Sequence, residues 1–116
     1  MNWEIKTSNQ YRSDLKETLL YIYEELANPN ASQRLADEVK KKYDILSDTP
    51  LIHAVVDDMY LAYFGIRLCV IRNYMLFYIA DEETNTVYIL RFLYARRNWT
   101  DILKNDFQNK IFYKFI

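Results

Sequence analysis

The chain has 116 residues, of which 51% are apolar and one is glycine, so its composition is that of one folded domain and excludes a disordered chain. Fifteen basic and sixteen acidic side chains leave a net charge of -1, without the basic excess of a general nucleic-acid binder. The charges are nevertheless divided, because residues 1–58 hold seven basic and eleven acidic side chains, whereas residues 59–116 hold eight and five. We therefore expect a single domain over residues 1–116 with an acidic part and a basic part.

The sequence also lacks the residues that several kinds of site require. One histidine, His53, and one cysteine, Cys69, cannot supply the usual nitrogen and sulfur ligands of zinc, so we expect no metal and no other cofactor. The longest apolar run, Tyr74 to Ala80, has seven residues, whereas a membrane-spanning helix needs about 20. Because no signal-peptide pattern opens the chain either, the sequence predicts a cytoplasmic protein that does not act at a membrane.

The first half of the chain predicts one strand and two helices. Met1, Trp3 and Ile5 alternate with polar residues, as in a strand with one buried face. Two apolar stripes at helical spacing follow, formed by Tyr11, Leu15, Leu19, Ile22 and Leu26 and then by Leu35, Val39, Tyr43 and Leu46. Asn28-Pro29-Asn30 separates the helices, and Asn30 with Gln33 predicts a capping box at the start of the second one.

The second half of the chain predicts a β-meander. Residues 51–61 are expected to form a loop or a ragged edge strand, and strands follow at 66–71, 74–80 and 87–94 with short polar turns between them. A short helix is expected after Trp99, and the apolar tail 111–116 is expected to dock on another surface. The predicted fold class is α+β: a strand, a helical hairpin, then an antiparallel β-meander with a short C-terminal helix, with a single layer of helices on a small sheet.

Four arginines and one tyrosine near the strand ends are the candidates for chemistry. Arg67 opens a strand, Arg91 interrupts an apolar strand, and Arg96 and Arg97 follow its end. If these ends converge, the guanidinium groups can clamp a phosphate and stabilise the charge of RNA self-cleavage, with Tyr94 as the nearest acid or base. The alternative is structural: Arg91 ties its strand to an acid in a loop, and Arg96 and Arg97 are exposed surface charges.

A series of short strings runs through nearly the whole chain. They are Asp14-Leu15, Tyr21-Ile22, Asn28-Pro29 with Ala31, Leu46 with Pro50, Gly65-Ile66-Arg67, Asn73-Tyr74, Phe77-Tyr78, and Val87-Tyr88-Ile89-Leu90-Arg91 running into Arg96-Arg97-Asn98-Trp99. In this order and at this spacing, the sequence resembles the RelE/ParE superfamily of bacterial type II toxin-antitoxin toxins, also called plasmid-stabilisation or addiction-module toxins.

The resemblance implies a cytoplasmic toxin that a cognate antitoxin protein neutralises, with a toxin-antitoxin heterotetramer as one assembly. One branch of the superfamily cuts mRNA in the ribosomal A site by 2′-hydroxyl attack, and another inhibits DNA gyrase without RNA chemistry. We hypothesise a ribosome-dependent mRNA endonuclease. A gyrase inhibitor and a degenerate module that only binds its antitoxin are the alternatives.

The resemblance also assigns roles to single residues. Arg67 and Arg96 match arginines of the mRNA-cutting branch and would act as catalytic phosphate clamps, with Tyr94 as the acid or base. Arg91 and Arg97 would contact the substrate or the target, and Arg91 with the Arg-Asn-Trp string looks closer to the gyrase-targeting type. Where the cutting branch often carries a catalytic Tyr or His, this chain has Asp101-Ile102-Leu103, which departs from that pattern.

Overall fold

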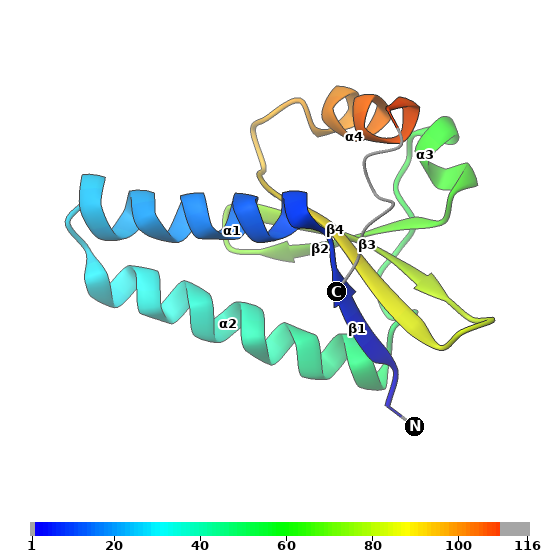
Figure 1. Ribbon diagram of the computed structural model, residues 1–116, viewed down its shortest axis with the longest axis horizontal. Coiled ribbons are helices and arrows are strands. Elements are labelled where there is room, and N and C mark those ends of the chain that lie inside the picture. Colours follow the sequence, from blue (N-terminus) through cyan, green and yellow to red (C-terminus); the bar gives the residue numbers. More distant parts are fainter. Residues whose placement is uncertain (1, 110–116) are drawn as a thin grey trace.

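A computed structural model of the chain describes residues 2–109 and forms one four-stranded sheet with helices packed on it (Figure 1). In chain order the elements are β1 Glu4–Thr7, α1 Asn9–Leu20, the π-helical turn η1 Tyr21–Glu25, α2 Pro29–Asp48, α3 Met59–Tyr63, β2 Ile66–Ile71, β3 Tyr74–Asp81, β4 Thr86–Tyr94 and α4 Trp99–Gln108. The α+β class and the order of the expected elements are confirmed. The short helix α3 is new, and the tail 111–116 lies outside the described residues.

The sheet is mixed, with strand order β1-β4-β3-β2. The expected antiparallel meander is formed by β2, β3 and β4, and β1 joins it by running parallel to β4, with Ile5 opposite Val87. A shift in register between Phe77 and Tyr78 interrupts the pairing of β3 with β4. The first strand of the chain therefore pairs with the last one, and β2 forms the opposite edge of the sheet.

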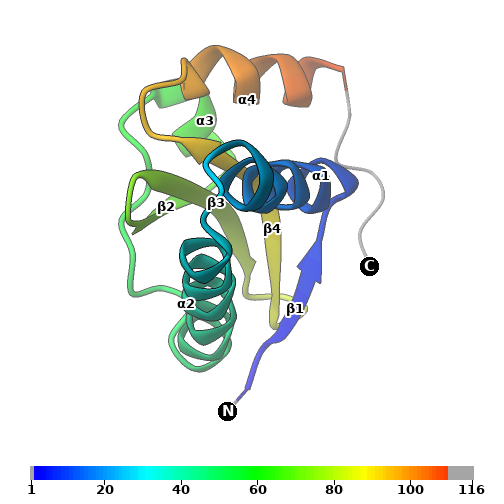
Figure 2. The ribbon, with the colours of Figure 1, turned by 90° about the vertical axis from the view of Figure 1, so that its left-hand side faces the viewer.

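Both faces of the sheet are covered by helices, rather than one face by a single layer (Figure 2). On one face, α1 and α2 bury Tyr11 and Leu35 against strand residues such as Ile89. On the other face, Leu61 of α3 and Leu103 of α4 are fully buried in a second cluster with strand residues. The second layer forms because apolar side chains alternate onto both faces of the strands and both sets must leave water.

A serine and an asparagine cap the N-termini of the long helices α1 and α2 and set where they begin. The Ser8 hydroxyl accepts a hydrogen bond from the Tyr11 backbone N–H at the start of α1. At the start of α2, Asn28 accepts from Ala31 and Pro29 occupies the first turn, where proline is well tolerated. The expected capping box at Asn30 is therefore wrong, since the helix begins before it.

Ser8 generates a test of how α1 is fixed to the sheet. Its side chain is fully buried, caps α1 and also donates to the Leu90 carbonyl oxygen at 2.7 Å. We expect Ser8→Ala to lower the free energy of unfolding by about 1–2 kcal/mol, because one cap and one buried hydrogen bond are lost. Chemical denaturation measures this, and Ser13→Ala at an exposed α1 position is the matched control. Equal effects of the two substitutions would contradict the assignment.

Candidate functional site

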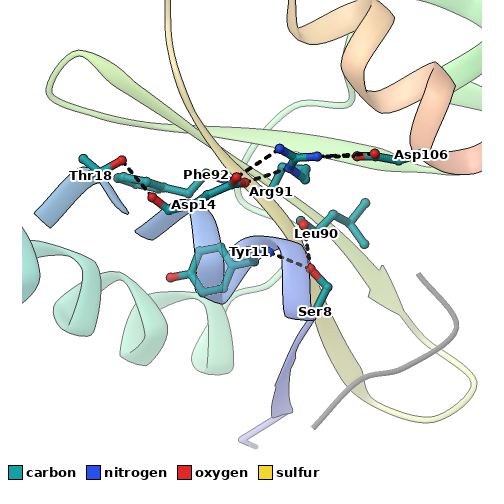
Figure 3. Close-up of polar contacts among 8 residues, drawn as sticks. All are labelled: Ser8, Tyr11, Asp14, Thr18, Leu90, Arg91, Phe92 and Asp106. Atoms are coloured by element: carbon teal, nitrogen blue, oxygen red, sulfur yellow. Dashed lines mark hydrogen bonds and ion pairs between the residues drawn. The ribbon is translucent and has the colours of Figure 1, made fainter. Parts of the chain in front are cut away.

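Arg91 lies between two carboxylates at the part of β4 that extends beyond β1 (Figure 3). Its Nε and Nη2 donate to the two carboxylate oxygens of Asp14 at 2.7 and 2.9 Å, and Nη1 donates to Asp106 at 3.0 Å. Asp14 belongs to α1 and Asp106 to α4, so the acids lie on helices rather than in a loop. This paired, fork-shaped contact is the strong form of an arginine ion pair, and it joins three elements.

The Asp14 carboxylate has a second role at the same place. It also accepts a hydrogen bond from the Phe92 backbone N–H at 3.0 Å. Because β1 pairs with β4 only as far as Ile89, this N–H has no neighbouring strand on that side. The carboxylate of α1 therefore takes the position that a strand would otherwise occupy.

The three side chains are largely buried, with exposed fractions of 11% for Asp14, 14% for Arg91 and 4% for Asp106. Burial raises the pKa of Asp14 and of Asp106 above the ordinary value of 3.8, while the hydrogen bonds and charge of Arg91 act in the opposite direction. Burial opposes the charge on Arg91, but its two acidic neighbours outweigh this and raise its pKa. The cluster holds two carboxylates and one guanidinium, so it depends on that single cation.

Next to Asp14 lies a groove of about 770 Å³ between α1 and the ends of β3 and β4. We call it the tyrosine groove, and it is lined by Asp14, Glu17, Thr18, Tyr21, Leu26, Asn73, Tyr74, Phe92, Tyr94 and Arg97. Rings form much of its wall: Tyr74 stacks on Phe92 at 5.1 Å between centroids and meets Tyr94 edge-on at 5.8 Å. The groove combines aromatic surface with charged groups of both signs.

The π-helical turn supplies one side of this groove. In η1 the Leu26 N–H bonds to the Tyr21 carbonyl, five residues back, so the turn is one residue wider than in an α-helix. Tyr21 is 55% exposed and Leu26 is 56% exposed. The expectation that Leu26 belongs to the buried stripe is therefore wrong, because the wide turn rotates it toward the groove. The periodicity that predicted the helix carries no signal for this turn.

Arg67 is not brought to the tyrosine groove. It lies on β2 opposite Tyr78, and its Nη1 donates to the His53 carbonyl oxygen at 2.6 Å. Register places Ile71, not Arg67, level with Tyr74 and Tyr94, so Arg67 is offset by four residues, or roughly 13 Å, along the strands. Cys69, whose side chain is buried, lies between Arg67 and the end of β2 that is level with the tyrosine groove. Arg67 thus anchors the loop before β2.

The remaining candidates lie near the end of β4. Tyr94 is 41% exposed and lines the groove together with Arg97, which follows in the turn after the strand. Arg96 is also exposed in that turn, and its side chain makes no hydrogen bond or ion pair within residues 2–109. The structure therefore brings Tyr94 and Arg97 together, places Arg91 beside them in its own ion pairs, and leaves Arg67 elsewhere.

Two further kinds of site are absent from the described part of the chain. Among residues 2–109, no three His, Cys, Asp or Glu side chains gather as a ligand set for a metal ion. Over the same residues, no helix is both long enough and apolar enough to span a membrane. His53, the single imidazole, lies with its ring 6.3 Å from that of Tyr78, and burial lowers its pKa. The groove is thus the candidate site that the structure offers.

Three solved structures with a similar fold are described as toxins or toxin-antitoxin proteins. A chain of the RelBE2 toxin-antitoxin complex of Mycobacterium tuberculosis matches with a TM-score of 0.59 and 22% identity, over 81% of this chain and 99% of that chain. The chromosomal ParDE system of P. aeruginosa matches with a TM-score of 0.64 and 12% identity, over 81% and 97%. A mutant of the E. coli toxin RelE in the free state matches with a TM-score of 0.61 and 14% identity, over 90% and 98%. The fold is therefore that of the RelE/ParE-type toxins.

The family follows from the sequence itself. Residues 5–99 match the family described as the ParE toxin of the type II toxin-antitoxin system, parDE. Since this match spans most of the 116 residues, the chain belongs to the ParE toxin family, which confirms the resemblance to the RelE/ParE superfamily. No curated protein sequence gives a significant match to the chain.

The buried ion pairs predict a pH-dependent loss of stability when Arg91 is removed. Arg91→Ala leaves two carboxylates without their cation, and we expect a loss of about 3–5 kcal/mol in unfolding free energy near pH 7. Removing the cation raises the pKa of Asp14 and Asp106 further. An acid whose pKa is higher in the folded than in the unfolded protein lowers the free energy of unfolding least at pH values below its unfolded pKa, where it is protonated in both states. The penalty should therefore shrink as the pH falls from 7 toward about 4.5.

Chemical denaturation of both proteins at the two pH values measures this effect. The exposed Arg96→Ala is the matched control, and we expect it to change stability by less than about 0.5 kcal/mol at either pH. A penalty for Arg91→Ala that stays the same at both pH values would show that the two carboxylates do not depend on this cation.

Proposed function

We propose that this protein is a growth-inhibiting toxin that binds and inhibits DNA gyrase through the tyrosine groove, rather than a toxin that cuts mRNA. The observation that carries the proposal is the separation of Arg67 from Tyr94 and Arg97. Membership of the ParE family supports the same choice. From the sequence alone we hypothesised mRNA cleavage, with gyrase inhibition as an alternative, and the proposal reverses this preference.

Cleavage of RNA by 2′-hydroxyl attack needs a clamp and an acid or base acting on one phosphate. A catalytic group must come within hydrogen-bond reach, about 3 Å, of the atom whose proton it moves. Arg67 and Tyr94 are offset by roughly 13 Å along the sheet and separated by the intervening strand β3. Because a carbonyl of the preceding loop also engages Arg67, its guanidinium does not meet the requirement of a clamp for a phosphate at Tyr94.

Binding, in contrast, needs only an exposed surface of suitable composition. Tyrosine and arginine are the residue types most enriched at the energetically important centres of protein interfaces. Tyr21 and Tyr94 are 55% and 41% exposed at the groove, and Arg97 lies at the same wall. The Tyr94 ring is already held edge-on against Tyr74, which stacks on Phe92, so a partner meets a wall at the strand ends that is formed in advance.

The proposed function includes a partner that controls the toxin. The similar structure from M. tuberculosis is described as a toxin-antitoxin complex, and that from P. aeruginosa as a ParDE toxin-antitoxin system. By family membership, this chain is the toxin of such a pair, and we propose that its cognate antitoxin neutralises it in the cytoplasm, with a heterotetramer as one assembly.

One observation keeps mRNA cleavage as a second candidate. Tyr94 and Arg97 line the same groove, so a phenol and a guanidinium could act on one phosphate without Arg67. In that case Tyr94 would serve as the acid or base and Arg97 as the clamp. The two candidates differ in what they require of the Tyr94 hydroxyl.

The choice can be tested with variants of Tyr94 and Arg97. In a gyrase supercoiling assay with purified toxin, we expect Tyr94→Ala and Arg97→Ala each to raise the half-inhibitory concentration about tenfold or more, as loss of an interface centre does. Tyr94→Phe should stay within about twofold, because the ring remains. Arg96→Ala, a neighbouring exposed arginine outside the groove lining, is the matched control.

The same variants are expressed without antitoxin and the ends of cellular mRNA are mapped. The gyrase proposal expects no codon-phased breaks. Such breaks in the wild type, lost about 100-fold or more in Tyr94→Phe as for an essential acid or base, would establish cleavage instead. Unchanged supercoiling, intact mRNA and normal growth would leave only the antitoxin-binding module.

A further inference from the structure

Three tyrosine side chains reach the tyrosine groove from three different elements. Tyr21 begins η1 directly after α1, Tyr74 begins β3 and Tyr94 ends β4, and all three line the groove. Burial raises the pKa of Tyr74, and the phenol groups of Tyr94 and Tyr21 raise it further, so both of these phenols lie near that of Tyr74. The groove therefore has aromatic surface on its helix wall and on its strand wall.

Glu17 adds a carboxylate to the helix wall of the same groove. It precedes Tyr21 by four residues, and Tyr21 still has helical dihedral angles, with φ −60° and ψ −47°. Residues four apart on a helix share one face, so the carboxylate lies beside the Tyr21 ring. The Glu17 side chain is exposed and makes no hydrogen bond or ion pair within residues 2–109.

The charges around the groove are one cation short of balance. Asp14 and Asp106 share the guanidinium of Arg91. Burial raises the pKa of Asp14, and the charge of Arg97 on the opposite wall acts against this rise. Together with Glu17, three carboxylates thus stand against two guanidinium groups. Glu17 is the carboxylate that no cation of the described residues neutralises.

Aromatic faces next to an unpaired carboxylate favour a cation as the ligand. The face of a tyrosine ring is negative and attracts a cation within about 6 Å of its centre. A planar guanidinium suits such a place better than an ammonium group, because it stacks on a ring and still donates paired hydrogen bonds to a carboxylate. A phosphate would instead meet the negative charge of Glu17. The chemistry of the groove therefore favours a basic protein side chain over a nucleic acid.

We propose that the tyrosine groove binds an arginine side chain of gyrase. The guanidinium of this arginine stacks on the rings of Tyr21 and Tyr74 and donates to the Glu17 carboxylate, and its aliphatic stem lies against Leu26 in the groove lining. The assignment rests on the proposed function, since it requires a protein target at this groove. Glu17 thereby selects the residue of the target that enters, although it holds no part of the fold together.

Small probes test the site on the full chain without gyrase. They are N-acetyl-arginine N-methylamide, its uncharged isostere N-acetyl-citrulline N-methylamide, and inorganic phosphate. Amide chemical shifts of the chain, followed by NMR, report the affinity and the place of binding. We expect the arginine probe to shift the amides of Glu17, Tyr21 and Tyr74 and to bind at least about fivefold more tightly than the citrulline probe. Phosphate should leave these three amides unshifted.

Variants of the helix wall sharpen this experiment. Glu17→Gln keeps the shape of the side chain and removes its charge, and we expect at least about threefold weaker binding of the arginine probe. Glu24→Gln makes the same change at an exposed position of η1 outside the groove lining, and its affinity should be unchanged. Tyr21→Phe should keep the affinity and Tyr21→Leu should lose it, because only the first keeps a ring. Thermal unfolding of each variant confirms that it is folded.

The gyrase supercoiling assay tests the same residue with the target present. We expect Glu17→Gln to raise the half-inhibitory concentration at least about threefold, and Glu17→Lys at least about tenfold, since a lysine there repels the incoming arginine. Glu24→Gln should inhibit as the wild type does.

Three results would overturn the proposal. They are equal affinity for the arginine and citrulline probes, an affinity for arginine that Glu17→Gln leaves unchanged, and phosphate bound at the groove more tightly than arginine, which would assign the groove to a nucleic acid. A wild-type chain that does not inhibit gyrase would refute the proposed function instead, while the probes would still decide whether the groove binds arginine. Inhibition that is lost in Tyr94→Ala but kept in Glu17→Gln and Glu17→Lys would remove only the arginine site.

Discussion

A single guanidinium, that of Arg91, keeps three separate parts of the fold in contact. It binds Asp14 from α1 and Asp106 from α4, which lie 77 and 15 residues away in the chain. Without it, two buried carboxylates would lose the cation that they share, which is strongly destabilising. Asp14 also accepts a hydrogen bond from the Phe92 backbone N–H at the edge of β4. The position of α1 beside the last strand thus depends on electrostatics as well as on apolar packing.

The contacts of Asp14 with Arg91 and Phe92 also determine the shape of the tyrosine groove. Asp14 and Phe92 are both part of its lining, so the contact that holds α1 to β4 also sets the distance between the two walls. The π-helical turn then adds Tyr21 from the α1 side, and the strand ends add Tyr74 and Tyr94. A wall formed by a helix end and strand ends requires no flexible loop. Surfaces held in this way lose little conformational entropy when a partner binds.

The sequence predicted the elements well because their signals are local. Alternation and helical spacing located the strands and the two long helices in chain order, and this order matched the family resemblance. The features it did not predict depend on contacts between distant residues. The register that separates Arg67 from Tyr94 arises from strand pairing, and the second acid for Arg91 lies on a helix whose position no local pattern reveals. The wide turn at Tyr21 shows no signal because its residues also suit an ordinary helix. Of the residues that the sequence named as candidates, Tyr94 and Arg97 line the tyrosine groove, although the sequence assigned them different roles and grouped Tyr94 with Arg67 and Arg96.

The pairing of the first strand with the last one has a consequence for the timing of synthesis. β1 pairs with β4, and the Ser8 hydroxyl donates to a carbonyl 82 residues further along the chain. A ribosome must therefore make the chain through β4 before β1 can pair with it. Contacts between such distant residues close late and slowly. A nascent chain that lacks β4 has neither the tyrosine groove nor the cation that binds Asp14 of α1, so the groove forms only after β4 has been made.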